Sequence, residues 1–314
     1  MDPESTLTLI ARRHDLTGAF SRLTEGQTNH VFTNGREVVR FARDPLRGTV
    51  SDVGEFEREA WCARAAAAVG VPTVEVLVVD ELPADDLESG RVPYQVQRFV
   101  EGTHPTSETP ALWERLGEYA ASLATVSLRD APDGLFSRFG RDLPLAWQRH
   151  VEYNLASLGD RGDGGDGDRL LALGVYEPDD LDWLVERTNA CRAPGGRFGL
   201  HHGDLNPGNV LVRPDGELVL IDWGSAAAGP VPWGDLVHLH RMEHLSGDRL
   251  QQAATFAAAF GVTADEVHAS LGDLDLLQAM DLVRWALDRR PDLLADHVEQ
   301  ARAVVRRRSR GERR

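Results

Sequence analysis

The segment from His202 to Asp222 concentrates the side chains that could do chemistry. It reads HGDLNPGNVLVRPDGELVLID, and a single residue separates His202 from Asp204. Asn209 follows Asp204 after four intervening residues, and Asp222 ends the segment. Two carboxylates, a carboxamide and an imidazole in so short a stretch make it the first candidate for a reactive site.

Two short apolar runs bring the ends of this segment back together. Residues 210–212 (VLV) and 218–221 (LVLI) predict two strands, and Pro-Asp-Gly at 214–216 predicts the turn between them. The strands of a hairpin run side by side. Asn209, just before the first strand, is therefore expected to lie close to Asp222, just after the second.

These residue types favour one kind of chemistry over its rivals. Oxygen ligands suit a hard ion such as Mg²⁺, so Asn209 and Asp222 are candidate metal ligands and Asp204 remains to accept a hydroxyl proton. That set matches phosphoryl transfer, in which a protein mainly positions groups and neutralises charge. A hydrolase triad fits poorly because no serine or cysteine stands in a nucleophile-elbow pattern with His202. Zinc fits poorly because His201 and His202 are adjacent.

The segment resembles the catalytic loop of kinases, H-x-D-x-x-x-x-N. Its form H-G-D-L-N-P-G-N is similar to that of the aminoglycoside phosphotransferase and choline kinase family. Asp222-Trp223-Gly224 stands where protein kinases carry D-F-G. The resemblance extends over about residues 23–239, and it implies a bilobal protein-kinase-like fold and a small-molecule kinase that uses ATP or GTP with Mg²⁺.

The resemblance also implies a role for each polar residue of the segment. Asp204 is the catalytic base, Asn209 and Asp222 hold Mg²⁺, and His202 braces the loop. Asp235, in the sequence Trp-Gly-Asp-Leu, is similar to the buried aspartate that fixes the catalytic loop in this family.

The first hundred residues should then supply the groups that hold the nucleotide. A turn of small and polar residues could let backbone N–H groups approach phosphate, and its members are Gly26, Gln27, Thr28 and Asn29. An ordinary hairpin turn explains the same residues equally well. The segment 97–102 resembles the hinge between kinase lobes, which implies that backbone groups near Phe99 and Val100 meet the adenine.

Arg40 stands where most kinases carry a lysine on the third strand, in a chain that contains no lysine. Arginine can pair with phosphate through two hydrogen bonds, unlike the point charge of lysine. An exposed arginine is the alternative, because strand alternation also permits exposure. On the helix that follows, the helical phase favours Glu59 over Glu57 as the partner of Arg40.

The element patterns predict an α+β protein in two lobes. The first hundred residues predict strands at 31–32, 38–41, 74–79 and 94–100 and helices at 4–14 and 55–69. Later residues predict helices at 112–123, 147–158, 250–260 and 274–287. We therefore expect a small antiparallel-sheet lobe at 1–101 that binds nucleotide and a mostly helical lobe at 102–314 with the catalytic loop and acceptor site. Residues 159–168 predict a solvated loop, and the basic tail 306–314 predicts disorder.

Composition limits the partners. The chain has 314 residues and a formal net charge of −16, which disfavours nucleic acid and anionic membranes as partners and would attract a cationic ligand. Solubility alone also explains an acidic balance. Two distant cysteines and the lack of a signal peptide or a long apolar run lead us to expect a reducing, cytoplasmic location.

The identity of the acceptor stays open at this point. One candidate is a cationic antibiotic such as an aminoglycoside or a macrolide, which would make the protein a resistance enzyme. Carboxylates that could receive its ammonium groups are Glu243, Asp275, Asp281 and Asp288, although solvated helix charges explain them too. A second candidate is a metabolite such as choline, a sugar or an amino alcohol. A nucleotide-binding pseudokinase is the third, and Arg40 is its only support.

Overall fold

The computed structural model describes residues 2–23, 29–42, 53–83, 91–159, 168–192, 197–241 and 248–312. The chain forms two compact units. The sheet unit comprises Met1–Ser107, Val126–Leu135 and Asn206–Ala226, and the helical unit comprises Glu108–Thr125, Phe136–Leu205 and Ala227–Arg314. Each unit is therefore built from three stretches that are separate in the sequence. The expected lobes, 1–101 and 102–314, are each one continuous stretch.

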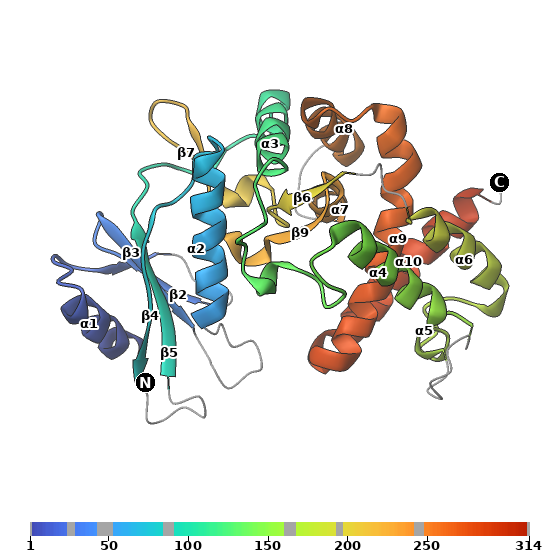
Figure 1. The fold of residues 1–314 in the computed structure, drawn as a ribbon, viewed down its shortest axis with the longest axis horizontal. Coiled ribbons are helices and arrows are strands. Elements are labelled where there is room, and N and C mark those ends of the chain that lie inside the picture. The colour runs from blue at the N-terminus through green and yellow to red at the C-terminus, as the bar shows by residue number, and fades with distance from the viewer. Residues whose placement is uncertain are drawn as a thin grey trace. The chain divides into compact units, whose positions relative to one another are not determined.

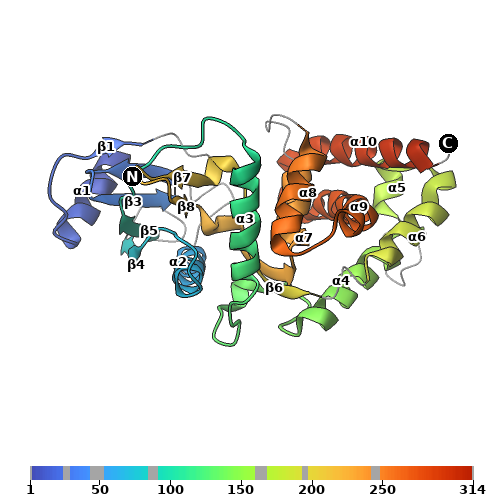
Figure 2. The same ribbon diagram turned by 90° about the horizontal axis from the view of Figure 1, so that it is seen from above.

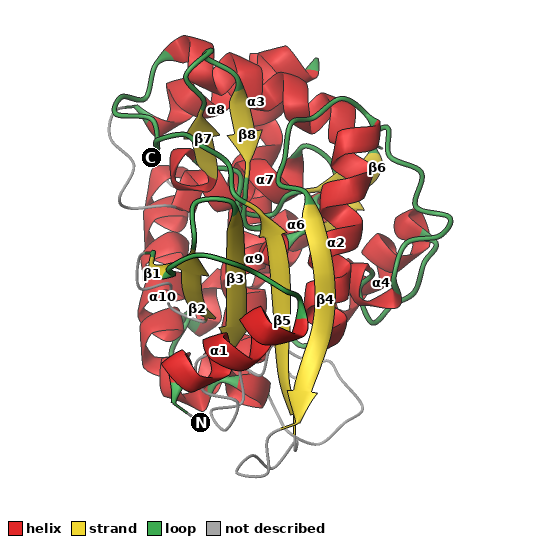
Figure 3. Ribbon diagram, turned by 90° about the vertical axis from the view of Figure 1, so that its left-hand side faces the viewer, coloured by secondary structure: helices red, strands yellow, loops and turns green. Residues whose placement is uncertain are grey.

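A five-stranded antiparallel sheet forms the framework of the sheet unit (Figure 3). Its strands lie in the order β1-β2-β3-β5-β4 and span Ser21–Arg22, Asn29–Thr33, Glu37–Ala42, Arg91–Arg98 and Val76–Pro83 respectively. The predicted antiparallel α+β architecture is confirmed. The sequence patterns located β2, β3 and β5 to within a few residues, while β4 begins and ends later than expected.

Helix α1 (Pro3–Arg13) and helix α2 (Val53–Ala68) cover opposite faces of this sheet (Figure 1). Successive side chains of a strand point to opposite faces. Val39 and Phe41 of β3 accordingly join the apolar core beneath α1, while Arg40 between them points toward α2. The alternation along β3 thus decides that Arg40 meets the helix that carries Glu59.

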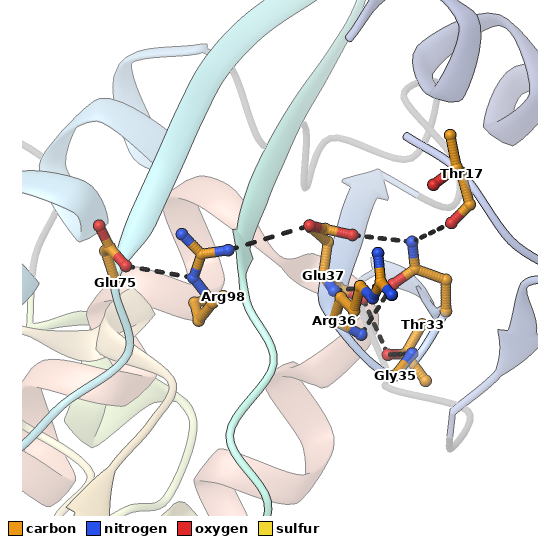
Figure 4. Close-up of polar contacts among 8 residues, drawn as sticks. Thr17, Thr33, Gly35, Arg36, Glu37, Glu75 and Arg98 are labelled. Carbon is orange, nitrogen blue, oxygen red and sulfur yellow. Dashed lines mark hydrogen bonds and ion pairs between the residues drawn. The ribbon is translucent and has the colours of Figure 1, made fainter. Parts of the chain in front are cut away.

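The turn between β2 and β3 explains why these two strands pair in one register. Figure 4 shows polar contacts around this turn, among them those of Thr33, Gly35, Arg36 and Glu37. The Asn34 Oδ1 accepts hydrogen bonds from the backbone N–H groups of Arg36 (2.9 Å) and Glu37 (2.7 Å). Gly35 adopts a φ of 81°, which glycine reaches without steric cost. The Asn-Gly pair therefore forms the predicted hairpin turn.

The predicted hairpin of the reactive segment is present in the sheet unit. β7 (Val210–Val212) pairs with β8 (Leu218–Leu220), and short 3₁₀ turns precede it at Pro207–Asn209 and follow it at Trp223–Ser225. Thr73 anchors the hairpin, because its Oγ1 donates to the Leu220 carbonyl at 2.9 Å and accepts from Trp223 Nε1 at 2.8 Å. The end of β8 is thereby fixed within the sheet unit.

The helical unit contains eight α-helices among its described residues (Figure 2). They are α3 (Pro110–Leu123), α4 (Leu143–Ala156), α5 (Arg169–Ala172), α6 (Leu181–Ala190), α7 (Trp233–Arg241), α8 (Arg249–Phe260) and α9 (Ala264–Arg289), and α10 (Leu294–Glu312) then ends the chain as an eighth. A two-stranded sheet joins β6 (Phe198–His201) to β9 (Ala227–Pro230). Helix α9 contacts six of the other helices and forms the axis of the unit.

One prediction about this part of the chain is wrong. The basic tail was expected to be disordered, but α10 continues as a helix to Glu312. The reason is an apolar face on the first part of α10, where Val298, Ala301 and Val305 recur at helical spacing and join the core beside α9. The loop expected at 159–168 lies mostly outside the described residues.

Two further expectations concern the chain as a whole. Cys62 and Cys191 are both buried and neither forms a disulfide, and Cys62 is a core residue of α2 as expected. In the described ranges, every helix is too short or too polar to cross a bilayer.

Helices α3 and α8 pack at unusually close range in the helical unit, and a glycine makes this possible. A Cβ at Gly117 would lie 2.2 Å from the Phe256 carbonyl oxygen and 2.8 Å from the Ala259 Cβ. We expect Gly117→Ala to lower the free energy of unfolding by about 1–3 kcal/mol, because overpacking outweighs the better helix propensity of alanine. Urea unfolding followed by circular dichroism measures this change.

Gly134→Ala is the matched control. A Cβ at Gly134 would meet no atom closer than 3.6 Å, so this variant should stay within about 0.5 kcal/mol of the parent chain. Equal stability of the two variants would contradict the close approach of α3 and α8.

Candidate active site

Arg40, Glu59 and Asp222 form a charged cluster in the sheet unit. Arg40 Nη1 lies 2.7 Å from Glu59 Oε2, and Arg40 Nη2 lies 3.6 Å from Asp222 Oδ1. The Arg40 side chain is only 12% exposed, which excludes the alternative of an exposed strand arginine. The structure therefore pairs Arg40 with Glu59, as the helical phase predicted, and adds Asp222 as a second carboxylate.

Burial and charge act against each other in this cluster. Burial alone would lower the pKa of Arg40, but the carboxylates of Glu59 and Asp222 outweigh it and the pKa is raised. Burial raises the pKa of Glu59, and the charge of Asp222 adds to this rise while Arg40 opposes it. The cluster thus pairs one guanidinium with two carboxyl groups, a composition that suits a site for a further cation.

Asp222 is held at the end of β8 in a left-handed backbone conformation, with φ 62° and ψ 74°. Residues other than glycine rarely adopt this conformation, and when they do the surrounding structure must hold them there. Its neighbour Ile221 donates its backbone N–H to the Asn209 carbonyl at 3.0 Å. Asn209 and Asp222 are thus adjacent across the hairpin, as the sequence predicted, and the Asp222 side chain is 56% exposed.

The donor set around Asp222 fits a magnesium ion. Asp222 and Asn209 offer oxygen atoms from a carboxylate and a carboxamide, and Mg²⁺ usually binds only one or two protein carboxylates while it keeps several waters. Within the described part of the chain, no group of three or more His, Cys, Asp or Glu side chains is arranged to hold a metal. The set is therefore unlike a zinc site, which needs three or four such ligands.

The segment around Asp204 belongs to the helical unit and is fixed by Asp235. Asp235 Oδ1 accepts the backbone N–H of Gly203 at 2.7 Å, and the backbone N–H of His202 donates to the same carboxylate. His202 is fully buried and Asp235 is 2% exposed. The two residues expected to support the loop are therefore inside the protein, and Asp204, two residues after His202, is partly exposed.

Helix α7 adds a contact that the sequence analysis missed. His238 Nε2 lies 2.7 Å from Asp204 Oδ1, and both side chains are partly exposed, at 36% and 28%. His238 follows Asp235 by three residues, so both lie on one face of the helix. The three-residue spacing of Asp235 and His238 is present in the sequence. It indicates a shared helix face only once residues 233–241 are known to be helical.

Two buried titratable groups next to this segment have strongly shifted pKa values. Burial raises the pKa of Asp235 to about 7, although hydrogen bonds from two backbone N–H groups work in the opposite direction. Burial lowers the pKa of His201 to about 4, and the charges of His202 and His238 lower it further. The ring of His201 lies against the backbone of Gly234, where a Cβ would come within 2.6 Å of the ring. His201 is therefore neutral near pH 7.

The structure describes only some of the residues expected to bind nucleotide. Gly26, Gln27 and Thr28 lie outside the described residues, and Asn29 opens β2 as a buried residue. The Phe99 N–H donates to the Arg36 carbonyl at 2.8 Å. A base at the expected hinge would therefore have to meet the Phe99 carbonyl or the backbone of Val100, and this remains a prediction.

The described carboxylates that were candidates for binding the ammonium groups of the acceptor interact with arginine or histidine side chains of this chain instead. Asp275 is buried, with Oδ2 3.3 Å from Arg307 Nη2 and 4.0 Å from His240 Nε2. Asp288 lies 3.2 Å from Arg169, and Asp281 is electrostatically coupled to Arg284. Glu243 lies outside the described residues. The three described carboxylates thus balance positive charge inside the helical unit.

The sequence from residue 19 to 271 matches the model of the phosphotransferase enzyme family. No curated protein matches the chain. Among solved structures, wild-type aminoglycoside 2'-phosphotransferase-IIIa in its GDP complex is 17% identical, with a TM-score of 0.67 and coverage of 96% of this chain and 99% of that one. Aminoglycoside phosphotransferase APH(4)-Ia is 18% identical, with a TM-score of 0.64 and coverage of 97% and 99%.

A third similar solved structure is not named as an aminoglycoside phosphotransferase. The microcompartment-associated aminopropanol kinase is 19% identical, with a TM-score of 0.60 and coverage of 96% of this chain and 94% of that one. At these identities the likenesses establish the fold, which is that of the protein-kinase-like small-molecule kinases. The chain belongs to the phosphotransferase enzyme family, whose model matches most of its length.

The raised pKa of Asp235 predicts how its replacement should depend on pH. The carboxyl titrates near 3.8 when unfolded and near 7 when folded, so its protonation stabilises the fold fully below pH 3.8 and this contribution is lost as the pH rises through 7. As the pH falls from 8 to 4, we expect the free energy of unfolding of the parent chain to rise relative to that of Asp235→Asn. The rise should be at most about 4 kcal/mol.

Urea unfolding of both chains at several pH values measures this difference. Asp215→Asn, in the exposed turn between β7 and β8, is the control and should show no comparable trend. A stability difference for Asp235→Asn that is the same at pH 8 and pH 4 would show that the carboxyl is not protonated preferentially in the folded state.

Proposed function

We propose that this phosphotransferase uses ATP or GTP with Mg²⁺ to phosphorylate a hydroxyl group of a small cationic molecule. The charged cluster of Arg40, Glu59 and Asp222 is the observation that carries the proposal, since it supplies a cation for phosphate next to a carboxylate for a metal. Bound Mg²⁺ would neutralise charge on the phosphate oxygens.

In this proposal the chain supplies four functions. Asp204 accepts the hydroxyl proton while the acceptor oxygen forms its bond to the γ-phosphorus and the bridging bond to the nucleoside diphosphate breaks. Arg40, held by Glu59, pairs with the inner phosphates through its planar guanidinium. Asn209 and Asp222 offer the oxygen atoms for the metal, and Asp235 with His202 keeps the backbone before Asp204 in place.

A cationic antibiotic such as an aminoglycoside or a macrolide is the first candidate for the acceptor, and an amino alcohol or similar metabolite is the second. The first is supported by structural neighbours named as aminoglycoside phosphotransferases, one of them solved as a GDP and kanamycin complex. The second is supported by the neighbour named as an aminopropanol kinase. The net charge of −16 attracts both kinds of cation. A pseudokinase is disfavoured, because Arg40 has the acidic partner that a functional phosphate ligand needs.

We also propose that the protein works in the cytoplasm, where nucleoside triphosphates are available. Its free buried cysteines suit that reducing compartment. Nucleic acid and anionic membranes are poor partners for so acidic a chain.

Phosphate transfer should be measured with ATP and with GTP against a panel of aminoglycosides, macrolides, choline, sugars and amino alcohols. We expect turnover with at least one cationic acceptor and a loss of about 10²–10⁴-fold in kcat for Asp204→Asn, because the amide cannot accept the proton. Nucleotide binding without transfer to any acceptor would favour a pseudokinase. Parent-level activity of Asp204→Asn would remove this residue from the role of base.

Replacement of Asp222 tests the metal site separately. We expect Asp222→Ala to lose Mg²⁺-dependent nucleotide binding and turnover, since the variant keeps only the carboxamide of Asn209 as an oxygen ligand. Titration of Mg²⁺ in the turnover assay and calorimetry of nucleotide binding measure the effect. Asp215→Ala, in the exposed turn of the same hairpin, should keep the parent's Mg²⁺ requirement. An unchanged requirement in Asp222→Ala would count against its role.

A further inference from the structure

One face of α7 supports three consecutive residues of the reactive segment. Asp235 accepts hydrogen bonds from the backbone of His202 and Gly203, and His238 contacts the side chain of Asp204. The two supporting residues are three positions apart, which places them on the same side of the helix. The helix therefore fixes both the backbone before Asp204 and the carboxylate of Asp204 itself.

The contact between His238 and Asp204 has the length of a hydrogen bond. The distance of 2.7 Å between Nε2 and Oδ1 fits a hydrogen bond in which the ring N–H donates to the carboxylate. A hydrogen bond to an ionised group is shorter and stronger than one between neutral groups. It holds the carboxylate plane in one orientation, which an aspartate side chain otherwise sets only loosely because its terminal torsion is broad.

The surroundings of His238 support a role at this segment. His238 stands three residues after Asp235 on α7, one helical turn away. His201 comes from β6 and is packed against Gly234 of α7. His238 is thus part of the polar group that fixes the segment, and it is the member in direct contact with the Asp204 side chain.

We infer that His238 is a positioning residue, which holds the carboxylate of Asp204 in the orientation that accepts the hydroxyl proton. The inference rests on the proposed function, since it gives Asp204 the role of base. Proton transfer needs the acceptor oxygen within hydrogen-bond reach of the hydroxyl, and small misplacements of such a group are costly. His238 acts only through Asp204 and takes no proton itself.

Two variants separate positioning from simple structural support. His238→Ala removes the donor but suits a helix, and His238→Gln keeps an N–H at the place of Nε2. We expect His238→Ala to lower kcat by about 10- to 100-fold with little change in the KM of the nucleotide. His238→Gln should recover most of this loss. His268→Ala, an exposed histidine of α9, should match the parent chain.

A double variant shows whether the effect passes through Asp204. When Asp204→Asn is already present, His238→Ala should cause no further loss of kcat, because there is no carboxylate to orient. An equal loss in both backgrounds would overturn the inference. So would parent-level kcat in His238→Ala, or a His238→Gln variant that folds as well as the parent and is as slow as His238→Ala.

A nuclear magnetic resonance measurement on the protein without substrate separates failure of the inference from failure of the proposed function. The Nε2–H proton of His238 should give a downfield resonance that disappears in His238→Ala and moves in Asp204→Asn. Its absence would overturn the inference whatever the activity. A parent chain that shows this resonance but transfers phosphate to no acceptor would refute the proposed function, and the positioning role would fall with it.

Discussion

The burial of Arg40 is the constraint on which the sheet unit depends. A guanidinium cannot lose its proton in a protein, so a buried arginine must be paired or its desolvation goes uncompensated. Strand alternation points Arg40 away from the core under α1, and the phase of α2 puts Glu59 opposite it at 2.7 Å. The hairpin then brings Asp222 to 3.6 Å. One buried charge thus ties the strand, the helix and the hairpin of this unit together.

In the helical unit, the corresponding constraint is to hold the partly exposed carboxylate of Asp204 on a rigid support. The buried carboxylate of Asp235 accepts hydrogen bonds from backbone N–H groups, and glycines let parts of the chain approach one another closely. Gly203 has a φ of 78°, and Gly234 leaves room for the ring of His201. A side chain at either glycine would strain the backbone or displace the ring. The support therefore depends on backbone contacts as much as on side chains, and the segment's own sequence reveals only part of it.

Much of the sheet unit and the pairing of Arg40 with Glu59 could be predicted from local sequence. The Asn-Gly turn, the hairpin around 214–216 and the helical phase of Glu59 are all short-range signals, and the structure contains each of them. The pairing of β6 with β9 joins residues far apart in the sequence, so no local pattern marked it. His238 was missed because α7 was not predicted. The basic tail was misjudged because it continues a helix whose apolar face, at Val298, Ala301 and Val305, lies just before it in the sequence.

The net charge of −16 gives less information about the acceptor than its magnitude suggests. Asp275 and Asp288 lie on the central helix α9 and pair with arginines of α10 and α5, so part of the negative charge holds the helical unit together. The remaining charge attracts cations over a distance and without selectivity, since screening limits such fields to about 10 Å at moderate salt. Aminoglycosides and amino alcohols are both cations, and this field favours both. Selection between these two proposed acceptor classes would then come from size and hydrogen bonding, because charge is what the two classes share.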